Sequence, residues 1–192
     1  MQDNILLSPH FELREFTESP KARKYGIVNE PPPEAIKNLK ALCVHTLEPL
    51  REALGLPIVI TSGYRTKELN SLLAHSSKCS QHMVGRAADF YVAPGPFSGS
   101  NIQDSGSGNQ SLNLETGASP MKLETSSRRE LLIRAFRQII TDDAIAFDQL
   151  IIYPSFIHVS YVSKEKNRRK ITTANGQGTY CAVSREQALV IV

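Results

Sequence analysis

The sequence predicts an α+β domain in which helices pack on one side of a small, mostly antiparallel sheet. Along the 192 residues, the hydrophobic patterns follow the order helices, strand, helix, strand, insertion, helix and β-hairpin. Hydrophobic residues make up 41% of the chain and charged residues 21%, which is typical of a globular protein. Because a chain of this length usually folds around one core, we expect a single domain over residues 1–192.

Two helical segments are expected before residue 55. Ser19 and Pro20 suit the N-cap and first position of a short helix, and Gly26 suits its end. Apolar residues then recur at helical spacing over residues 36–54. Pro49 lies inside this second pattern, so we expect it to kink the helix or to start a new one.

Two short strands and a helix are predicted next. The β-branched run at residues 58–61 indicates a buried strand, and residues 67–74 show helical spacing. Residues 86–92 indicate a second strand, in which Asp89 lies on the face opposite the apolar side chains.

A turn-rich segment interrupts the second half of the chain. Residues 94–126 are rich in glycine, serine and proline. We interpret them as a flexible surface insertion rather than a domain linker, because too little chain follows to build a second domain. Ser127 to Glu130 forms a capping-box pattern, which predicts that an apolar helix starts there. Residues 149–153 and 156–161 indicate two strands of a hairpin.

Charge, cysteine content and the N-terminal sequence argue against several classes of protein. A formal net charge of +3 suits an anionic polymer but is too weak to indicate nucleic-acid binding. Three widely spaced cysteines do not suggest a disulfide framework. No apolar run approaches the length of a membrane span, and the first residues do not resemble a signal peptide. We therefore expect a soluble protein made in the cytoplasm without a recognisable export signal.

Three residues form a candidate metal site. Asp89 follows His82 by seven residues, and Gly85 lets the chain turn between them, while His158 lies in the predicted hairpin. Two imidazoles and a carboxylate suit catalytic zinc, for which three protein ligands leave a fourth position open. On spacing alone, the alternative that these are separate structural residues stays open.

Three ordered motifs resemble a known family. An SGYR element occupies residues 62–65, and an apolar-apolar-His-Val-Ser element occupies residues 156–160. Between them, the pattern SxHxxGxAxD is matched by Ser80, His82, Gly85, Ala87 and Asp89. Together with N-terminal matches such as Gly26-Ile27-x-Asn29, these motifs resemble the zinc D-alanyl-D-alanine carboxypeptidases, a peptidase M15-like family that includes phage endolysin peptidases. The resemblance covers roughly residues 8–92 and 128–163.

The resemblance implies a Hedgehog/D-Ala-D-Ala peptidase-like fold. It also implies a set of zinc ligands, namely His82, Asp89 and His158. Arg65 matches the arginine that orients or polarises the substrate carbonyl, a role that suits a permanently charged guanidinium; an ion pair with a surface carboxylate is the alternative. Ser80 matches a residue that holds the substrate terminus, although a serine also suits a turn. Tyr64 and Gln81 are expected to line the substrate pocket.

The expected general base is missing from the sequence. Many family members carry an acidic residue shortly before the last histidine, often three positions earlier, and that position is Ser155 here. A serine cannot act as the base in that way. The nearest upstream acid is Asp148, which we take as the candidate base, with Glu68 as a second candidate. Either another acid substitutes or the activity is impaired.

The resemblance predicts a zinc metallopeptidase that hydrolyses the D-amino-acid-containing stem peptides of peptidoglycan, as a carboxypeptidase or an endopeptidase. We expect it to act as a monomer in the cell wall or periplasm, with no nucleic-acid partner and no membrane span. The alternative is a catalytically impaired module that binds a wall peptide or a protein partner, which the missing acid favours. A purely structural metal domain is disfavoured by the open fourth position.

Overall fold

A computed structural model describes residues 5–73, 76–94, 120–174 and 179–191. The N-terminal elements are β1 (Leu6–Ser8), β2 (Phe11–Glu12), α1 (Leu13–Thr17), α2 (Pro20–Tyr25), α3 (Pro33–Leu42), the π-helical segment η1 (Cys43–Leu47) and α4 (Glu48–Leu54). The central elements are β3 (Ile58–Ser62), α5 (Lys67–Ser71), the 3-10 helix η2 (Gln81–Val84) and β4 (Ala87–Val92). The C-terminal elements are α6 (Pro120–Thr141), β5 (Gln149–Ile152), β6 (Ile157–Ser160), β7 (Lys170–Ala174), β8 (Tyr180–Val183) and α7 (Arg185–Ile191).

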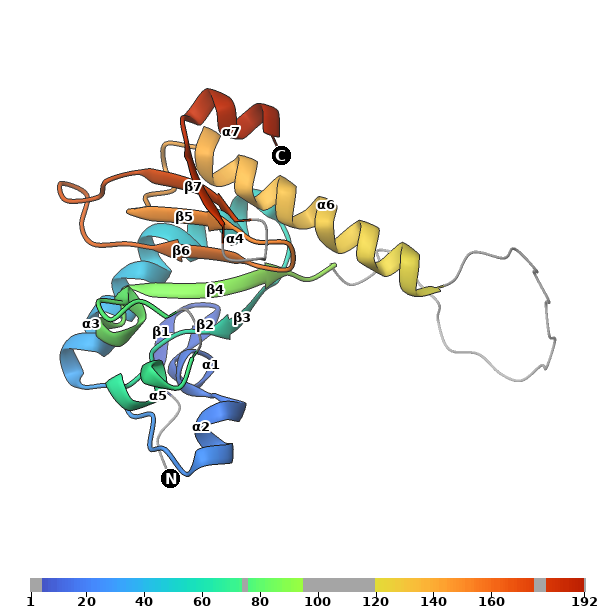
Figure 1. Cartoon of the computed structure of the whole chain (residues 1–192). Helices are drawn as coiled ribbons and strands as arrows, with labels where there is room; N and C mark the ends of the chain where they lie inside the picture. The colour runs from blue at the N-terminus through green and yellow to red at the C-terminus, as the bar shows by residue number, and fades with distance from the viewer. Residues whose placement is uncertain (1–4, 74–75, 95–119, 175–178, 192) are drawn as a thin grey trace, which may run out of the picture.

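The main sheet runs in the order β3-β4-β6-β5-β7-β8. Neighbouring strands pair in antiparallel fashion except β5 and β7, which are parallel. Helices α1 and α2 lie beyond the β3 side of the sheet and α7 lies beyond the β7 side (Figure 1). The α+β class and the largely antiparallel sheet predicted from the sequence are therefore confirmed.

The hydrophobic core lies on one face of this sheet. Alternate residues of β4, namely Ala88, Phe90 and Val92, are buried there against apolar side chains of α3, α4 and α6. Because successive side chains of a strand point to opposite faces, this pattern leaves Asp89 and Tyr91 on the other face, where both are half-buried. Burial of the core face thus fixes which face of β4 is free for polar chemistry.

Several predicted boundaries agree with the structure. The Ser19 side chain accepts a hydrogen bond from the backbone N–H of Ala22, and Gly26 ends α2 with a φ of 63°. The long helical pattern is divided by η1, and Pro49 lies in the first turn of α4, so it belongs to the start of a new helix. A proline is tolerated there because the carbonyl four residues earlier, that of His45, accepts from the backbone N–H of Ala146 instead.

The boundary predicted for the long helix after the insertion is wrong. Helix α6 begins at Pro120, so Ser127 lies inside the helix and does not cap it. The turn-rich composition extends past the point where the helix starts, whereas proline at the first helical position is a start signal in its own right. The predicted insertion at 94–126 is thus helical from residue 120, and its residues 95–119 lie outside the described part of the chain.

Two further differences concern the helix after β3 and the C-terminus. Helix α5 ends at Ser71, shorter than the predicted 67–74, whose last residue lies outside the described ranges. The last part of the chain, which matched no motif, adds β7 and β8 to the sheet. All three cysteines are free thiols. In the described part of the chain, every helix is too short or too polar to cross a bilayer.

Two glycines let the segments around the predicted ligands approach the N-terminal helices closely. At Gly63, a Cβ would overlap the backbone of Phe16 in α1. At Gly85, φ is +70° and a Cβ would overlap the backbone of Ala35 in α3. The close packing of η2 on α3 therefore requires glycine at position 85 for two separate reasons.

We expect Gly85→Ala to lower the free energy of unfolding by at least about 2 kcal/mol, because a left-handed conformation and an overlap with backbone are both imposed. Gly26→Ala is the matched control, since Gly26 has a similar φ of +63° but open space around it. Gly26→Ala should lower the free energy of unfolding by about 1 kcal/mol. Urea denaturation measures both variants, and equal losses would show that contact with α3 contributes nothing.

Candidate metal centre

The register of β4 against β6 places two of the predicted ligands side by side. Asp89 is directly opposite His158 in this antiparallel pair. Side chains of directly opposed residues point to the same face, and here it is the face opposite the core. The Nδ1 atom of His158 lies 2.8 Å from Oδ1 of Asp89. Pairing of β4 with β6 therefore positions two of the three predicted ligands.

The third predicted ligand comes from η2, just before β4. The Nε2 atom of His82 lies 3.3 Å from Oδ1 of Asp89 and 3.2 Å from Nδ1 of His158. One donor atom from each of the three residues lies within 4.8 Å of the others, so the group could hold a metal ion. Atoms bound tetrahedrally at zinc distances lie about 3.4 Å apart, which is close to these separations.

A backbone carbonyl orients His82. Its Nδ1 atom lies 2.6 Å from the carbonyl oxygen of Gly63, so Nδ1–H donates to that oxygen. The other ring nitrogen, Nε2, then carries the lone pair and points at Asp89 and His158. Burial lowers the pKa of His82, although the neighbouring Asp89 opposes this effect. A hydrogen bond of this kind to a histidine ligand is a common support in metal sites.

Asp89 is held in its charged form. Burial alone raises the pKa of a carboxyl group, but the charges of and hydrogen bonds from His82 and His158 outweigh it and keep the pKa of Asp89 below its ordinary value. Arg65 lies on the other side, with an Nη2 atom 3.6 Å from Oδ2 of Asp89. Donor type, spacing and protonation therefore all fit a cation such as zinc.

Arg65 is half-buried, and its Nε atom is buried without a partner in the described part of the chain. Burial lowers the pKa of Arg65, and the charge of Asp89 acts in the opposite direction. The carboxylate nearest to Arg65 among the ion pairs of the described residues is Asp89, which is itself a member of the cluster. An N–H group that is already desolvated and still unpaired is suited to receive an oxygen atom of a ligand.

Asn29 supports the loop that carries Arg65, a role that the sequence motifs did not reveal. Its side-chain oxygen accepts from the backbone N–H of Thr66, and its Nδ2 atom donates to the carbonyl of Tyr64. The same Nδ2 atom donates to the carbonyl of Thr17 in α1. One amide side chain therefore fixes both neighbours of Arg65 and ties them to the N-terminal helices.

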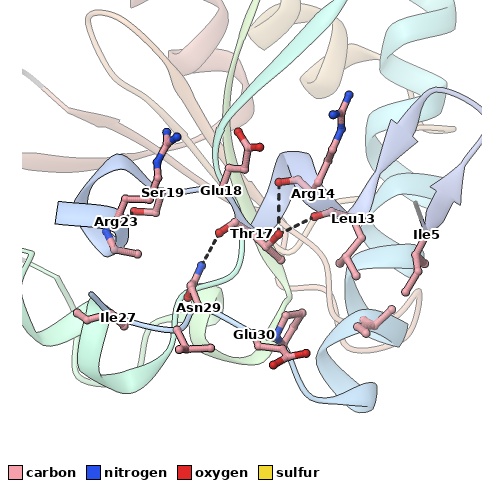
Figure 2. Close-up of a pocket in the computed structure, with 14 residues that line it drawn as sticks. Ile5, Leu13, Arg14, Thr17, Glu18, Ser19, Arg23, Ile27, Asn29 and Glu30 are labelled. Carbon is pink, nitrogen blue, oxygen red and sulfur yellow. Dashed lines mark hydrogen bonds between the residues drawn. The ribbon is translucent and has the colours of Figure 1, made fainter. Parts of the chain in front are cut away.

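A surface cavity of about 630 Å³ lies behind this loop, against α1, α2 and the segment that follows them. Figure 2 shows Asn29 at this cavity, pointing towards Thr17. None of the residues that line the cavity belongs to the histidine–aspartate cluster. The cavity and the cluster are thus separate features, linked by Asn29.

Asp148, the predicted general base, is buried, and both of its carboxylate oxygens accept hydrogen bonds from other residues. Its Oδ2 atom accepts from Gln81 at 2.9 Å and from Nη2 of Arg168 at 2.5 Å. Its Oδ1 atom accepts from the backbone N–H and Nε of Arg168 at 2.8 and 2.9 Å. Burial raises the pKa of Asp148, but these hydrogen bonds outweigh it and lower the pKa to about 2. Such a carboxylate is a poor proton acceptor near neutral pH.

The three predicted substrate-binding residues have different surroundings. Tyr64 is buried and belongs to the hydrophobic core. Gln81 extends towards Asp148, and its side-chain oxygen is buried without a partner among the described residues. Ser80 is half-buried and immediately precedes η2. Glu68, the second candidate base, is exposed on α5. Within the described ranges, the cluster contains no carboxylate besides Asp89.

Comparison with known proteins agrees with this geometry. A family model described as Peptidase M15 matches residues 9–105, which is 97 of the 192 residues. The matched range contains Arg65, His82 and Asp89, whereas His158 follows it. No curated protein matches the chain. The match covers half of the sequence and coincides with the half that carries the first two predicted ligands, so the chain belongs to the peptidase M15 family.

Proposed function

We propose that the protein is a zinc-dependent metallopeptidase that hydrolyses D-amino-acid-containing stem peptides of peptidoglycan, as a carboxypeptidase or an endopeptidase. The observation that carries the proposal is the convergence of His82, Asp89 and His158 on one point, with Arg65 beside them. Membership of the peptidase M15 family supports hydrolysis of a peptide bond. The motifs shared with D-alanyl-D-alanine carboxypeptidases support the substrate class.

The ligand set suits a metal that works as a catalyst. His82, Asp89 and His158 would hold zinc by two nitrogens and one oxygen, and sites with three protein ligands keep a position open. Zinc bound there would supply Lewis-acid chemistry to a peptide carbonyl. In this proposal Arg65 binds the carbonyl oxygen as negative charge develops on it, and its buried Nε–H, which has no partner in the described part of the chain, supports this role.

Asp148 has a positioning role in this proposal instead of the role of base. It binds Gln81, which precedes the ligand His82 in η2, and it binds Arg168 in the segment between β6 and β7. The carboxylate therefore connects η2 to the segment that leads into β7. A displaced Gln81 would shift the backbone of His82, and positions in a catalytic site tolerate only small shifts.

A second function has one observation in its favour. The cluster has no second carboxylate within the described residues, and Asp148 is held by Arg168. A protein that keeps the metal ligands but lacks a base would bind a wall peptide without cleaving it. The experiments below separate these two functions.

We expect the purified protein to contain about one zinc ion per chain, and His82→Ala and His158→Ala to lose it. His10→Ala is the matched control, because His10 is exposed and pairs with Glu48 away from the cluster. Elemental analysis after dialysis measures the stoichiometry. Full zinc content in either cluster variant would contradict the ligand assignment.

Incubation with purified muropeptides should release D-alanine or open a cross-link, and a chelator should stop the reaction. Mass spectrometry identifies the bond, and matched peptides with L-alanine at the same position test the stereochemical preference. Cleavage that survives chelation would argue against a metallopeptidase. Binding of muropeptides without any cleavage would favour the second function.

We expect Asp148→Asn to destabilise the protein by about 1–2 kcal/mol at pH 7. The pKa of Asp148 is lowered to about 2, below its unfolded value, so its contribution to stability is complete above about pH 4 and is lost as the pH falls through 2. The stability difference between wild type and variant should therefore shrink between pH 4 and pH 2.

Urea denaturation across this pH range measures the difference. Asp143→Asn is the control, because the Asp143 carboxylate is 82% exposed and contacts Arg169 and Arg185 only at 3.5 and 3.9 Å. A difference for Asp148→Asn that stays constant from pH 7 to pH 2 would contradict the proposed anchoring by Arg168.

A further inference from the structure

A row of aromatic residues lies next to the ligand row on the same face of the sheet. The ligand row crosses the sheet through the pairs Asp89–His158 and His158–Ile151. The neighbouring row lies two residues away on each strand and on the same face of the sheet. It carries the aromatic residues Tyr91, Phe156, Tyr153 and Tyr180. Tyr91, Phe156 and Tyr153 are half-buried, and Tyr180 is 49% exposed. This face therefore offers ring surfaces and hydroxyl groups beside the cluster.

Tyr153 is the best-fixed member of this row. Its ring stacks on Phe156, with centroids 4.3 Å apart and planes inclined by 14°. Its backbone N–H donates to the carbonyl of Phe156, and its carbonyl accepts from Nη1 of Arg129 in α6. Its hydroxyl donates a long hydrogen bond of 3.4 Å to the hydroxyl of Tyr180, which a substrate oxygen would have to replace as the acceptor. A residue held at both the backbone and the ring keeps its hydroxyl in one place.

The Tyr153 hydroxyl is in the electrostatic field of the cluster. Burial raises the pKa of Tyr153, the Tyr180 hydroxyl and Asp89 raise it further, and Arg65 acts in the opposite direction. In turn, Tyr153 acts to raise the pKa of Arg65, against the larger effect of burial. A phenol in this position stays protonated near neutral pH, so it can donate a hydrogen bond but cannot act as a base.

Tyr153 and Arg65 lie on opposite sides of the ligands. Arg65 follows β3, and Tyr153 follows β5. The two strands between them, β4 and β6, carry Asp89 and His158. An oxygen atom of a substrate placed over the ligands would therefore have a donor on each side.

We propose that Tyr153 is a further catalytic residue of this centre, whose hydroxyl donates a hydrogen bond to the same peptide carbonyl oxygen that Arg65 binds from the other side. The inference rests on the proposed peptidase function. The phenol keeps its proton throughout, and its contribution is to stabilise negative charge on the oxygen. Preorganised donors aimed at such an oxygen are among the strongest contributors to catalysis.

The test is Tyr153→Phe, which removes one oxygen atom and keeps the ring that stacks on Phe156. We expect kcat/KM for muropeptides to fall by about 10-fold to 100-fold, with zinc content and thermal stability unchanged. Tyr91→Phe is the matched control, because it removes a hydroxyl from the same row on β4. Its kcat/KM should stay within about 3-fold of the wild type, as expected for a group that is not aimed at the reaction.

A binding measurement supplies a readout that does not depend on turnover. The probe is a phosphinate analogue of D-alanyl-D-alanine, which carries tetrahedral oxygens in place of the carbonyl, and calorimetry gives its Kd. Tyr153→Phe should weaken this binding by about 10-fold or more, while binding of the product D-alanine changes less. Tyr91→Phe should change neither.

The outcomes separate this inference from the function on which it rests. Wild-type cleavage and phosphinate binding that Tyr153→Phe leaves intact would overturn the role of Tyr153 alone. Equal losses in Tyr153→Phe and Tyr91→Phe would also overturn it, because the effect would then belong to the whole row. A wild-type protein that holds zinc but neither cleaves muropeptides nor binds the phosphinate would overturn the proposed function and this inference together.

Discussion

The antiparallel register between β4 and β6 is the constraint on which the site depends. It places Asp89 opposite His158, and the core face of β4 fixes this register by burying Ala88, Phe90 and Val92. A slip of one residue would turn His158 into the core and bring Val159 to the site. The hydrophobic core thus positions the polar site on the opposite face of the sheet.

The loops around the sheet complete the site through backbone contacts. The carbonyl of Gly63 orients His82, and the amide of Asn29 holds the residues on both sides of Arg65. Both contacts depend on the N-terminal helices, because Gly63 packs directly on the backbone of Phe16 in α1. The N-terminal helices therefore support both the predicted ligand His82 and the neighbouring Arg65.

The structure changes the interpretation of Asp148, the candidate replacement for the acid that is missing before His158. Asp148 looked like a substitute because it was the nearest carboxylate upstream of His158, but Arg168 and Gln81 occupy both of its oxygens. Tyr153, five residues further along, shares the face of the ligands and the field of Asp89. The two residues differ in how firmly their polar atoms are held, because Asp148 accepts several short hydrogen bonds and the Tyr153 hydroxyl has one long contact, with Tyr180.

The sequence by itself determined the α+β class, the short helix between Ser19 and Gly26, the strands that carry Asp89 and His158, and the candidate ligands. These depend on local periodicity, capping residues and motifs, all of which are visible along the chain. Only the tertiary structure decided that Asp148 pairs with Arg168, that Asn29 holds the loop of Arg65, and that Tyr153 lies beside the cluster. The reason is physical: strand pairing brings together residues far apart in sequence, and no local pattern records which partner occupies a buried polar atom.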